Sequence, residues 1–220
     1  MRVSTGISRF DEILHGGLIP ARVYLVHGEP GTGKTTLGFH FLVAGAAARQ
    51  KCLLIAFDQV EENIRADARS LGLNLDGVTI LDLMPVPEIF YELKTYDIFS
   101  PVEVEREPIT LEILKAIQEN DPRRIFVDGF GHLGEIAGDP FHRRRLIQSF
   151  FRFATQRGAT LMIASEEPKC ARDVDGVIHL ECTHDLRSLR VTKFRGSDSL
   201  AGRHPMRITS HGLEIPSSAA

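Results

Sequence analysis

A glycine-rich stretch at residues 28–36, GEPGTGKTT, constrains the fold of this chain more than any other feature. It fits the phosphate-loop pattern G-x-x-x-x-G-K-[ST] without a mismatch. The apolar run at 22–27 predicts a buried strand before it, and the run at 35–48 predicts a buried helix after it. A strand, a glycine loop and a helix in this order direct a helix N-terminus at an anion. The alternative, an ordinary glycine-rich turn, does not account for these flanking elements.

The residues of the loop indicate how a nucleoside triphosphate would be held. Glycines let successive backbone N–H groups turn inward and cradle phosphate oxygens. Lys34 would reach the β- and γ-phosphates, and the Thr35 hydroxyl would ligate Mg²⁺. The residues of the loop that are expected to bind the nucleotide are Glu29, Pro30, Gly31, Thr32, Gly33, Lys34, Thr35 and Thr36.

The remaining chain alternates strand-like and helix-like runs. Continuous apolar runs, typical of strands covered on both faces of a parallel sheet, lie at 23–27, 52–57, 78–83, 125–128, 160–165 and 177–180. Helical patterns lie at 35–49, 61–71, 110–120 and 140–156. This alternation predicts a three-layer α/β fold with a mostly parallel, twisted sheet.

The C-terminal part has a different pattern. Residues 187–195 alternate polar and apolar side chains, and short apolar runs at 205–209 and 213–215 flank a Ser-His-Gly turn. We expect an antiparallel hairpin extension on the edge of the sheet. We also expect residues 1–215 to form a single domain and residues 216–220 to form a flexible tail.

Composition narrows the function classes. The chain has 220 residues, of which 43% are hydrophobic and 25% charged, as in globular proteins. Its net charge of -3 gives no general attraction to nucleic acid or to an anionic membrane. No apolar run approaches the ~20 residues that span a bilayer. The N-terminus lacks a secretory apolar core, and three scattered cysteines favour neither a disulfide framework nor a zinc site, so the expected compartment is a reducing cytoplasm.

Two carboxylates are predicted to lie beside the phosphate loop. Asp128 ends an apolar run, as in a Walker B strand, and would hold Mg²⁺ together with Thr35. Asp58 follows another apolar run, and the carboxyl ends of parallel strands converge on the ligand crevice. Asp58 is therefore the candidate for the residue that orients an attacking water. The alternative is that Asp58 caps the helix at 61–71.

Three other charged segments carry weaker predictions. Residues 101–108, PVEVEREP, are polar and bounded by prolines, which predicts a surface loop with solvated glutamates. The three arginines at 143–145 would fan out by ~100° each on a helix, which indicates the basic side of an amphipathic helix and not a phosphate site. Residues 166–167, Glu-Glu, either face the site or lie at the surface.

Together these features are similar to those of the KaiC family within the RecA-like ATPases. Residues 5–18 resemble its N-terminal segment, 56–71 the region of its catalytic acidic pair, and 175–180 with 189–209 its C-terminal hairpin. The resemblance spans residues 4–215. It implies a RecA-like sheet, ATP and Mg²⁺ as cofactors, and assembly into a homo-oligomeric ring, often a hexamer, with nucleotides between neighbouring subunits.

The resemblance also implies roles for residues outside the loop. Lys193 and Arg195 would reach across the interface to the nucleotide of the neighbouring subunit. Because they lie at i and i+2 on a strand, both would point to one face and stabilise charge on a γ-phosphate. The alternative for this pair is a solvated strand face. The other implied nucleotide-binding residues are Ser197 in the same segment, and Ser70, Thr209 and Ser210 near the base or ribose.

Two departures from the family pattern bear on activity. Active members carry adjacent glutamates where this chain has Asp58-Gln59, so we expect slow hydrolysis, since Asp is one methylene shorter and Gln is not a base. Residues 168–174 contain no hydroxyl side chain, so we expect no autophosphorylation there.

The leading hypothesis is a slow ATPase that couples nucleotide state to ring assembly or to an unidentified signalling partner. The alternatives are a non-hydrolysing ATP-dependent assembly module and, less favoured, a recombinase-like DNA-binding protein.

Overall fold

The computed structural model describes residues 1–85, 101–135, 139–184 and 186–216. Its strands are β1 (Val23–His27), β2 (Cys52–Ala56), β3 (Val78–Asp82), β4 (Arg124–Asp128), β5 (Thr160–Ser165), β6 (Gly176–Thr183), β7 (Leu186–Phe194), β8 (His204–Thr209) and β9 (Gly212–Glu214). Its helices are α1 (Ser8–Ile13), α2 (Lys34–Ala47), α3 (Glu61–Ser70), α5 (Pro101–Asn120), α6 (Phe130–Glu135) and α7 (Pro140–Gln156).

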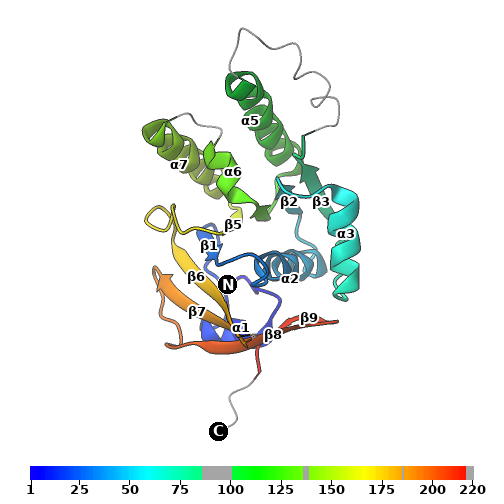
Figure 1. The fold of residues 1–220 in the computed structure, drawn as a ribbon, viewed down its shortest axis with the longest axis vertical. Coiled ribbons are helices and arrows are strands. Elements are labelled where there is room, and N and C mark those ends of the chain that lie inside the picture. The colour runs from blue at the N-terminus through cyan, green and yellow to red at the C-terminus, as the bar shows by residue number, and fades with distance from the viewer. Residues whose placement is uncertain (86–100, 136–138, 185, 217–220) are drawn as a thin grey trace.

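The strands form one sheet in the order β3-β2-β4-β5-β1-β6-β7-β8-β9 (Figure 1). The strands from β3 to β6 in this order are paired in parallel, and β6 to β9 continue the sheet as an antiparallel extension. The prediction of a mostly parallel RecA-like sheet with a C-terminal antiparallel hairpin is therefore confirmed. Since β1 lies between β5 and β6, the loop that follows β1 opens beside the carboxyl ends of these parallel strands.

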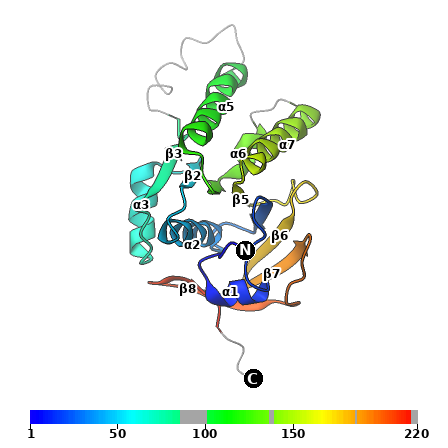
Figure 2. The same cartoon turned by 180° about the vertical axis from the view of Figure 1, so that it is seen from behind.

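Each face of the sheet has its own apolar core, which is what makes three layers. Alternate residues of the central strands, such as Tyr24 and Leu54, pack with α1, α2 and α3 and with β8 and β9. Their neighbours, such as Leu25 and Leu53, pack with α5, α6 and α7. Figures 1 and 2 show α5, α6 and α7 together on one side of the parallel strands and α2 on the other. Burial on both faces explains why these strands are continuous apolar runs.

Helix α2 packs unusually close to the sheet because it carries glycines where it crosses the strands. A Cβ at Gly38 would overlap the ring of Phe126 on β4. A Cβ at Gly45 would lie 2.5 Å from side-chain atoms of Arg124 and Cys52. This close packing holds α2, which begins at the end of the phosphate loop, against β4 and β2.

The structure corrects one prediction and adds two elements. Residues 101–108 are not a surface loop but the first part of α5. Pro101 is the first residue of that helix, where its missing N–H costs nothing, so the proline that suggested a break marks a start. Helices α1 and α6, six residues each, were not predicted because they are too short to show a periodic pattern. Of the predicted tail at 216–220, residues 217–220 lie outside the described part of the chain.

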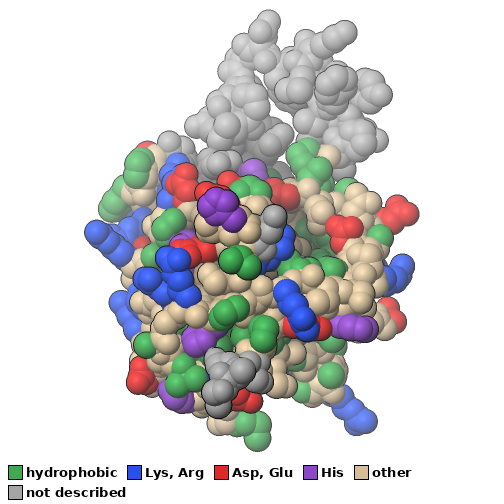
Figure 3. Space-filling view, turned by 60° about the horizontal axis from the view of Figure 1, so that its bottom comes forward, with side chains coloured by type: hydrophobic (Ala, Val, Ile, Leu, Met, Phe, Trp, Pro, Cys, Tyr) green, Lys and Arg blue, Asp and Glu red, His purple; other side chains and the backbone are tan. Residues whose placement is uncertain are grey.

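The surface carries both signs of charge. The face shown in Figure 3 mixes Lys and Arg with Asp and Glu side chains. None of the helices in the described ranges is both long enough and apolar enough to cross a membrane.

Candidate nucleotide-binding site

The phosphate loop connects β1 directly to α2. Gly28 follows the last residue of β1 and lies so close to β6 that a Cβ there would overlap the carbonyl oxygen of Leu180. Gly33, at φ +104, is the left-handed residue from which α2 begins at Lys34. The Thr32 hydroxyl donates to the Glu29 carbonyl at 2.8 Å and closes the loop. The sequence therefore forms a short, closed loop that ends at the N-terminus of a helix, where backbone N–H groups have no partner within the helix.

The Lys34 ammonium group lies across this loop. Its Nζ donates to the carbonyl oxygens of Gly28 at 2.7 Å and Glu29 at 2.9 Å. Burial lowers the pKa of Lys34, and the nearby carboxylates of Glu166 and Asp128 act in the opposite direction. A phosphate group is a stronger acceptor than these carbonyls, so Lys34 is placed to exchange them for phosphate oxygens.

Thr35 and Asp128 meet at the start of α2. The Thr35 hydroxyl lies close enough to the Asp128 carboxylate, at the end of β4, to act on its pKa. Burial raises the pKa of Asp128, and the charge of Asp58 raises it further, whereas the hydrogen bonds from Thr35 and the Gly129 N–H lower it. A desolvated carboxylate beside a hydroxyl suits Mg²⁺, which typically takes one or two protein oxygens and completes its shell with phosphates and water. These residues therefore fit the predicted cation.

Asp58 lies just beyond β2, and its side chain contacts α6. Its Oδ1 is 2.8 Å from Nε2 of His132. Its carboxylate also lies against Gly129, where a Cβ would overlap it. The capping alternative is wrong, because the Glu61 N–H at the start of α3 donates to Oδ2 of Asp82 at 3.1 Å. The sequence did not single out His132.

A cavity of about 1160 Å³ brings these groups together. It is larger than the ~300–1,000 Å³ of most ligand pockets. Of the predicted site residues, it is lined by Pro30, Gly31, Lys34, Thr35, Thr36, Asp58, Ser70 and Asp128. It is also lined by His132, Arg143, Arg144, Glu166, Glu167 and Lys169. Residues 166–167 therefore face the site, which was one of the two alternatives for them.

The arginines at 143–145 do diverge, as the helical geometry requires. Arg144 pairs with Asp173 at 3.0 Å, whereas the Arg145 guanidinium lies 5.7 Å from the centre of the Phe141 ring. Arg143 and Arg144 line the cavity. The basic side of α7 thus faces the cavity, which the helical pattern alone did not indicate.

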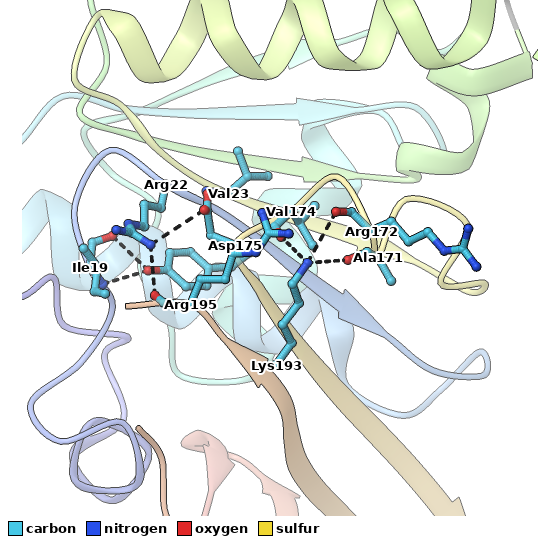
Figure 4. Close-up of polar contacts among 10 residues, drawn as sticks. Ile19, Arg22, Val23, Ala171, Arg172, Val174, Asp175, Lys193 and Arg195 are labelled. Atoms are coloured by element: carbon cyan, nitrogen blue, oxygen red, sulfur yellow. Dashed lines mark hydrogen bonds and ion pairs between the residues drawn. The ribbon is translucent and has the colours of Figure 1, made fainter. Parts of the chain in front are cut away.

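Lys193 is held by its own chain, as Figure 4 shows. Its Nζ donates to the carbonyl oxygens of Val174 at 2.6 Å, Ala171 at 2.8 Å and Arg172 at 3.5 Å. Burial lowers its pKa, and the charge of Arg195 lowers it further. The solvated-face alternative does not describe this lysine, because its ammonium group is bound by three backbone carbonyls.

The pairing of β7 shows where Lys193 lies relative to the phosphate loop. Lys193 pairs with Val177 near the start of β6, and Val177 pairs with Leu25 of β1. The lysine therefore lies toward the amino end of the parallel strands, whereas the loop follows their carboxyl ends. Neither Lys193 nor Arg195 is among the residues that line the cavity.

The segment after β7 is tied down by its backbone. The Arg195 N–H donates to the Asp175 carbonyl at 2.8 Å, and the Arg195 carbonyl accepts from Arg22 at 2.9 Å (Figure 4). The Ser197 hydroxyl accepts from Arg2 at 2.7 Å. Ser197 therefore contacts the N-terminal segment and not the cavity of its own chain.

The turn between β8 and β9 lies close to both α2 and α3. Ile208 reaches the loop, since a Cβ at Gly33 would lie 3.0 Å from its Cδ1, and Ser210 lies against Gly72. The Thr209 hydroxyl donates to Glu214 at 3.1 Å. The Ser70 hydroxyl donates to the Asp67 carbonyl at 2.7 Å. Of these three predicted site residues, only Ser70 lines the cavity.

Arg187 is a contact that the sequence did not indicate. Its Nε and one terminal nitrogen lie 3.4 Å from the Gly31 carbonyl oxygen of the loop. Arg187 pairs with Cys182 at the end of β6, level with the loop. In the sequence it is one of several arginines in an alternating strand, and no spacing distinguishes it.

Here a glycine loop joins a strand to a helix that begins with Lys-Thr, and a carboxylate at the end of another strand lies beside it. These features define the class of P-loop nucleotide-binding proteins with a RecA-like sheet. The family model described as "ATPase: KaiC" matches residues 3–220, so the chain belongs to the KaiC family. The resemblance seen in the sequence is therefore confirmed. The chain is a RecA-like, ATP-binding ATPase domain of this family.

Individual relatives agree with this assignment. A UPF0273 protein of Thermotoga maritima is 29% identical over 97% of this chain and 95% of the relative. A UPF0273 protein of Methanocaldococcus jannaschii is 30% identical over 97% of this chain and 96% of the relative. The circadian clock protein KaiC2 of Synechocystis is 27% identical over 98% of this chain, which corresponds to 40% of that longer relative.

Proposed function

We propose that this protein hydrolyses ATP slowly at a site completed by a neighbouring copy, and that the bound nucleotide controls ring assembly or contact with a signalling partner. Residues 1–215 act as one domain in this proposal. The observation that carries it is that Lys34, Thr35, Asp58 and Asp128 line one cavity together.

Each group in the cavity has a defined task in this reaction. Lys34 and the backbone N–H groups of the phosphate loop hold the phosphates. Thr35 and Asp128 would hold Mg²⁺, which neutralises phosphate charge when bound. Asp58 orients the attacking water and accepts its proton. The family's pattern assigns Ser70, Thr209 and Ser210 to the base or ribose.

Two observations support a site between subunits. Lys193 and Arg195 lie outside the cavity of their own chain, and Lys193 lies toward the other end of the parallel strands. Residues that a chain cannot bring to its own loop can still serve a copy related by head-to-tail contact, and such contacts close into rings. In this proposal Lys193, Arg195 and Ser197 act on the nucleotide of the neighbour, and a hexamer is the expected ring.

Nucleotide binding is tested with Lys34→Ala. Ligand at 100 times its Kd stabilises a folded protein by about 2.7 kcal/mol, so ATP with Mg²⁺ should raise the melting temperature of the wild type. Lys34→Ala should lose this shift. The matched control is Lys115→Ala, which removes an exposed lysine that pairs with Glu119 on α5. An equal shift in Lys34→Ala and the wild type would contradict the assignment of the site.

A second candidate function is an ATP-dependent assembly module that does not hydrolyse. The shorter Asp58 and the Gln59 beside it favour this candidate. Single-turnover hydrolysis by the wild type and by Asp58→Ala, alongside light scattering with and without ATP and Mg²⁺, separates the two. A rate that Asp58→Ala abolishes supports the ATPase. Nucleotide-dependent assembly without phosphate release supports the module.

A further inference from the structure

A histidine from α6 contacts the one carboxylate that remains where active family members have two. Asp58 and His132 each expose 53% of the side chain, and Nε2 of His132 lies 2.8 Å from Oδ1 of Asp58. Both side chains line the cavity that contains Lys34 and Asp128. The contact is therefore within the proposed site and accessible from it.

The histidine is held in place independently of Asp58. Its ring lies 6.3 Å from that of Phe57, the buried residue that precedes Asp58. Helix α6 begins two residues after Asp128, and Phe130 in its first turn packs against Phe151 of α7, with ring centres 5.6 Å apart. Two buried aromatic residues thus fix the helix that carries His132.

The second oxygen of Asp58 faces the metal-binding strand. Oδ2 is the Asp58 atom closest to the position that a Cβ of Gly129 would take, and Gly129 directly follows Asp128. The effect of the Asp58 charge on the pKa of Asp128 places the two carboxylates within electrostatic range. With Oδ1 occupied by His132, Oδ2 is the oxygen directed to the Asp128 side of the cavity.

We propose that His132 is a positioning residue for hydrolysis: its Nε2–H holds Oδ1 of Asp58 so that Oδ2 receives the proton of the attacking water. This inference rests on the proposed function. In the step, the water oxygen bonds to the γ-phosphorus, the bond to the β–γ bridging oxygen breaks, and ADP leaves. The water proton passes to Oδ2, and His132 keeps its own proton throughout.

A fixed carboxylate matters more here than in a site with two glutamates. The shorter side chain of Asp58 has less reach, and Gln59 cannot replace it as a base. Misplacement of a reacting group by about 1 Å costs on the order of a hundredfold in rate. The hydrogen bond from His132 restricts the carboxylate to one orientation, which offsets the missing methylene group and the missing second base.

The test compares His132→Ala with His132→Gln, whose amide can replace the Nε2–H donor. We expect His132→Ala to lower kcat by roughly ten- to hundredfold, with the Kd for a non-hydrolysable ATP analogue within about twofold of the wild type. We expect His132→Gln to recover most of the loss. In an Asp58→Asn background, His132→Ala should have little further effect, since the two side chains act as one unit.

The matched control is His142→Ala, another exposed histidine that pairs with an aspartate, Asp139, outside the cavity. It should retain the wild-type kcat. An unchanged kcat in His132→Ala, equal losses in His132→Ala and His132→Gln, or lost analogue binding in His132→Ala would each overturn the positioning role. Analogue binding without turnover in the wild type would instead overturn the proposed hydrolysis, and the positioning role with it.

Discussion

At the scale of single residues, Gly129 is the position on which both carboxylates of the site depend. It lies between strand β4, which ends in Asp128, and helix α6, at φ +71. Its Cα lies against the Asp58 carboxylate, so that a Cβ would overlap it. Since L residues rarely adopt this φ, a side chain here would be both strained and in the way of Asp58.

We therefore expect Gly129→Ala to lower kcat at least tenfold and to destabilise the fold by about 1–3 kcal/mol. Phosphate release and urea unfolding measure the two effects. The control is Gly131→Ala in α6, where a Cβ would meet no atom of the described residues within 4 Å apart from its neighbours in the helix. The control should be as active and at least as stable as the wild type, because alanine favours a helix. Equal activity in both variants would contradict the proposed role of Asp58.

His27, the last residue of β1, gives the fold a pH dependence. Its ring stacks on His179, with centres 4.3 Å apart and planes at 4°. Burial lowers its pKa from 6.5 to about 4; the charges of His179 and Lys34 act in the same direction, and that of Glu181 opposes them. The unfolded chain therefore binds a proton at a higher pH than the folded one. Stability from His27 is complete above about pH 6.5 and is lost as the pH falls toward 4.

We expect the wild type to lose more stability than His27→Gln between pH 7.5 and pH 5. The difference is at most about 2 kcal/mol at 1.36 kcal/mol per pKa unit, and smaller because the ring is partly exposed. Urea unfolding of both proteins at the two pH values measures it. Titration of other groups is common to both proteins, so parallel losses would show that the His27 imidazole does not contribute.

At the scale of elements, the sequence of α2 favours close packing on the sheet over high helix propensity. Gly38→Ala would improve helix propensity by about 1 kcal/mol. We nevertheless expect it to destabilise the protein by about 1–3 kcal/mol, since the added carbon would overlap the Phe126 ring. Unfolding midpoints measure the change. The loss should be smaller in a Phe126→Leu background, and a Gly38→Ala variant more stable than the wild type would exclude this close packing.

Elements with a strong local signal were predictable from the sequence. The ends of α7 at 140 and 156 were predicted as observed, because Asp139 caps the helix and Pro140 begins it. The central strands were predictable because burial on both faces makes them continuous apolar runs. The start of α5 was not, because Pro101 marks both loops and the first turns of helices.

The candidate site likewise contains residues that the sequence pattern located and residues that only the fold brings together. The loop carries its chemistry in consecutive residues, so the pattern alone located Lys34 and Thr35. His132 was missed because its partner Asp58 is distant in sequence, and the two meet only when β2 and β4 pair. Arg187 likewise reaches the loop only through the register of β7 on β6. Contacts made by the topology leave no pattern in the sequence.

At the scale of the whole molecule, the site is predicted to be divided between copies. Lys34→Ala removes the loop lysine, and a Lys193→Ala/Arg195→Ala double variant removes the residues offered to a neighbour. Each should hydrolyse ATP poorly alone. When they are mixed, roughly one quarter of the interfaces join an intact loop to an intact Lys193–Arg195 pair, so activity should recover to about that share.

Phosphate release from the mixture, compared with the sum of the separate proteins, measures the recovery. The control is a mixture of the Lys34→Ala variant with the active Lys115→Ala variant. It measures how much ATPase activity an active protein loses when it is mixed with inactive copies. Light scattering establishes that both variants assemble with ATP. Full assembly without any recovery would show that Lys193 and Arg195 serve their own chain.

The ammonium group of Lys193 cannot keep its three hydrogen bonds within its own chain and also bind the phosphate of a neighbouring subunit. The turn that accepts them, residues 171–174, adjoins Cys170 and includes Asp173, and both residues line the subunit's own cavity. If Lys193 turns to a neighbour's phosphate, these carbonyls lose their donor and the turn is free to rearrange. Nucleotide bound to one subunit would then change the lining of the cavity in the neighbour that supplies Lys193. Subunits around a ring would therefore hydrolyse ATP in sequence and not independently.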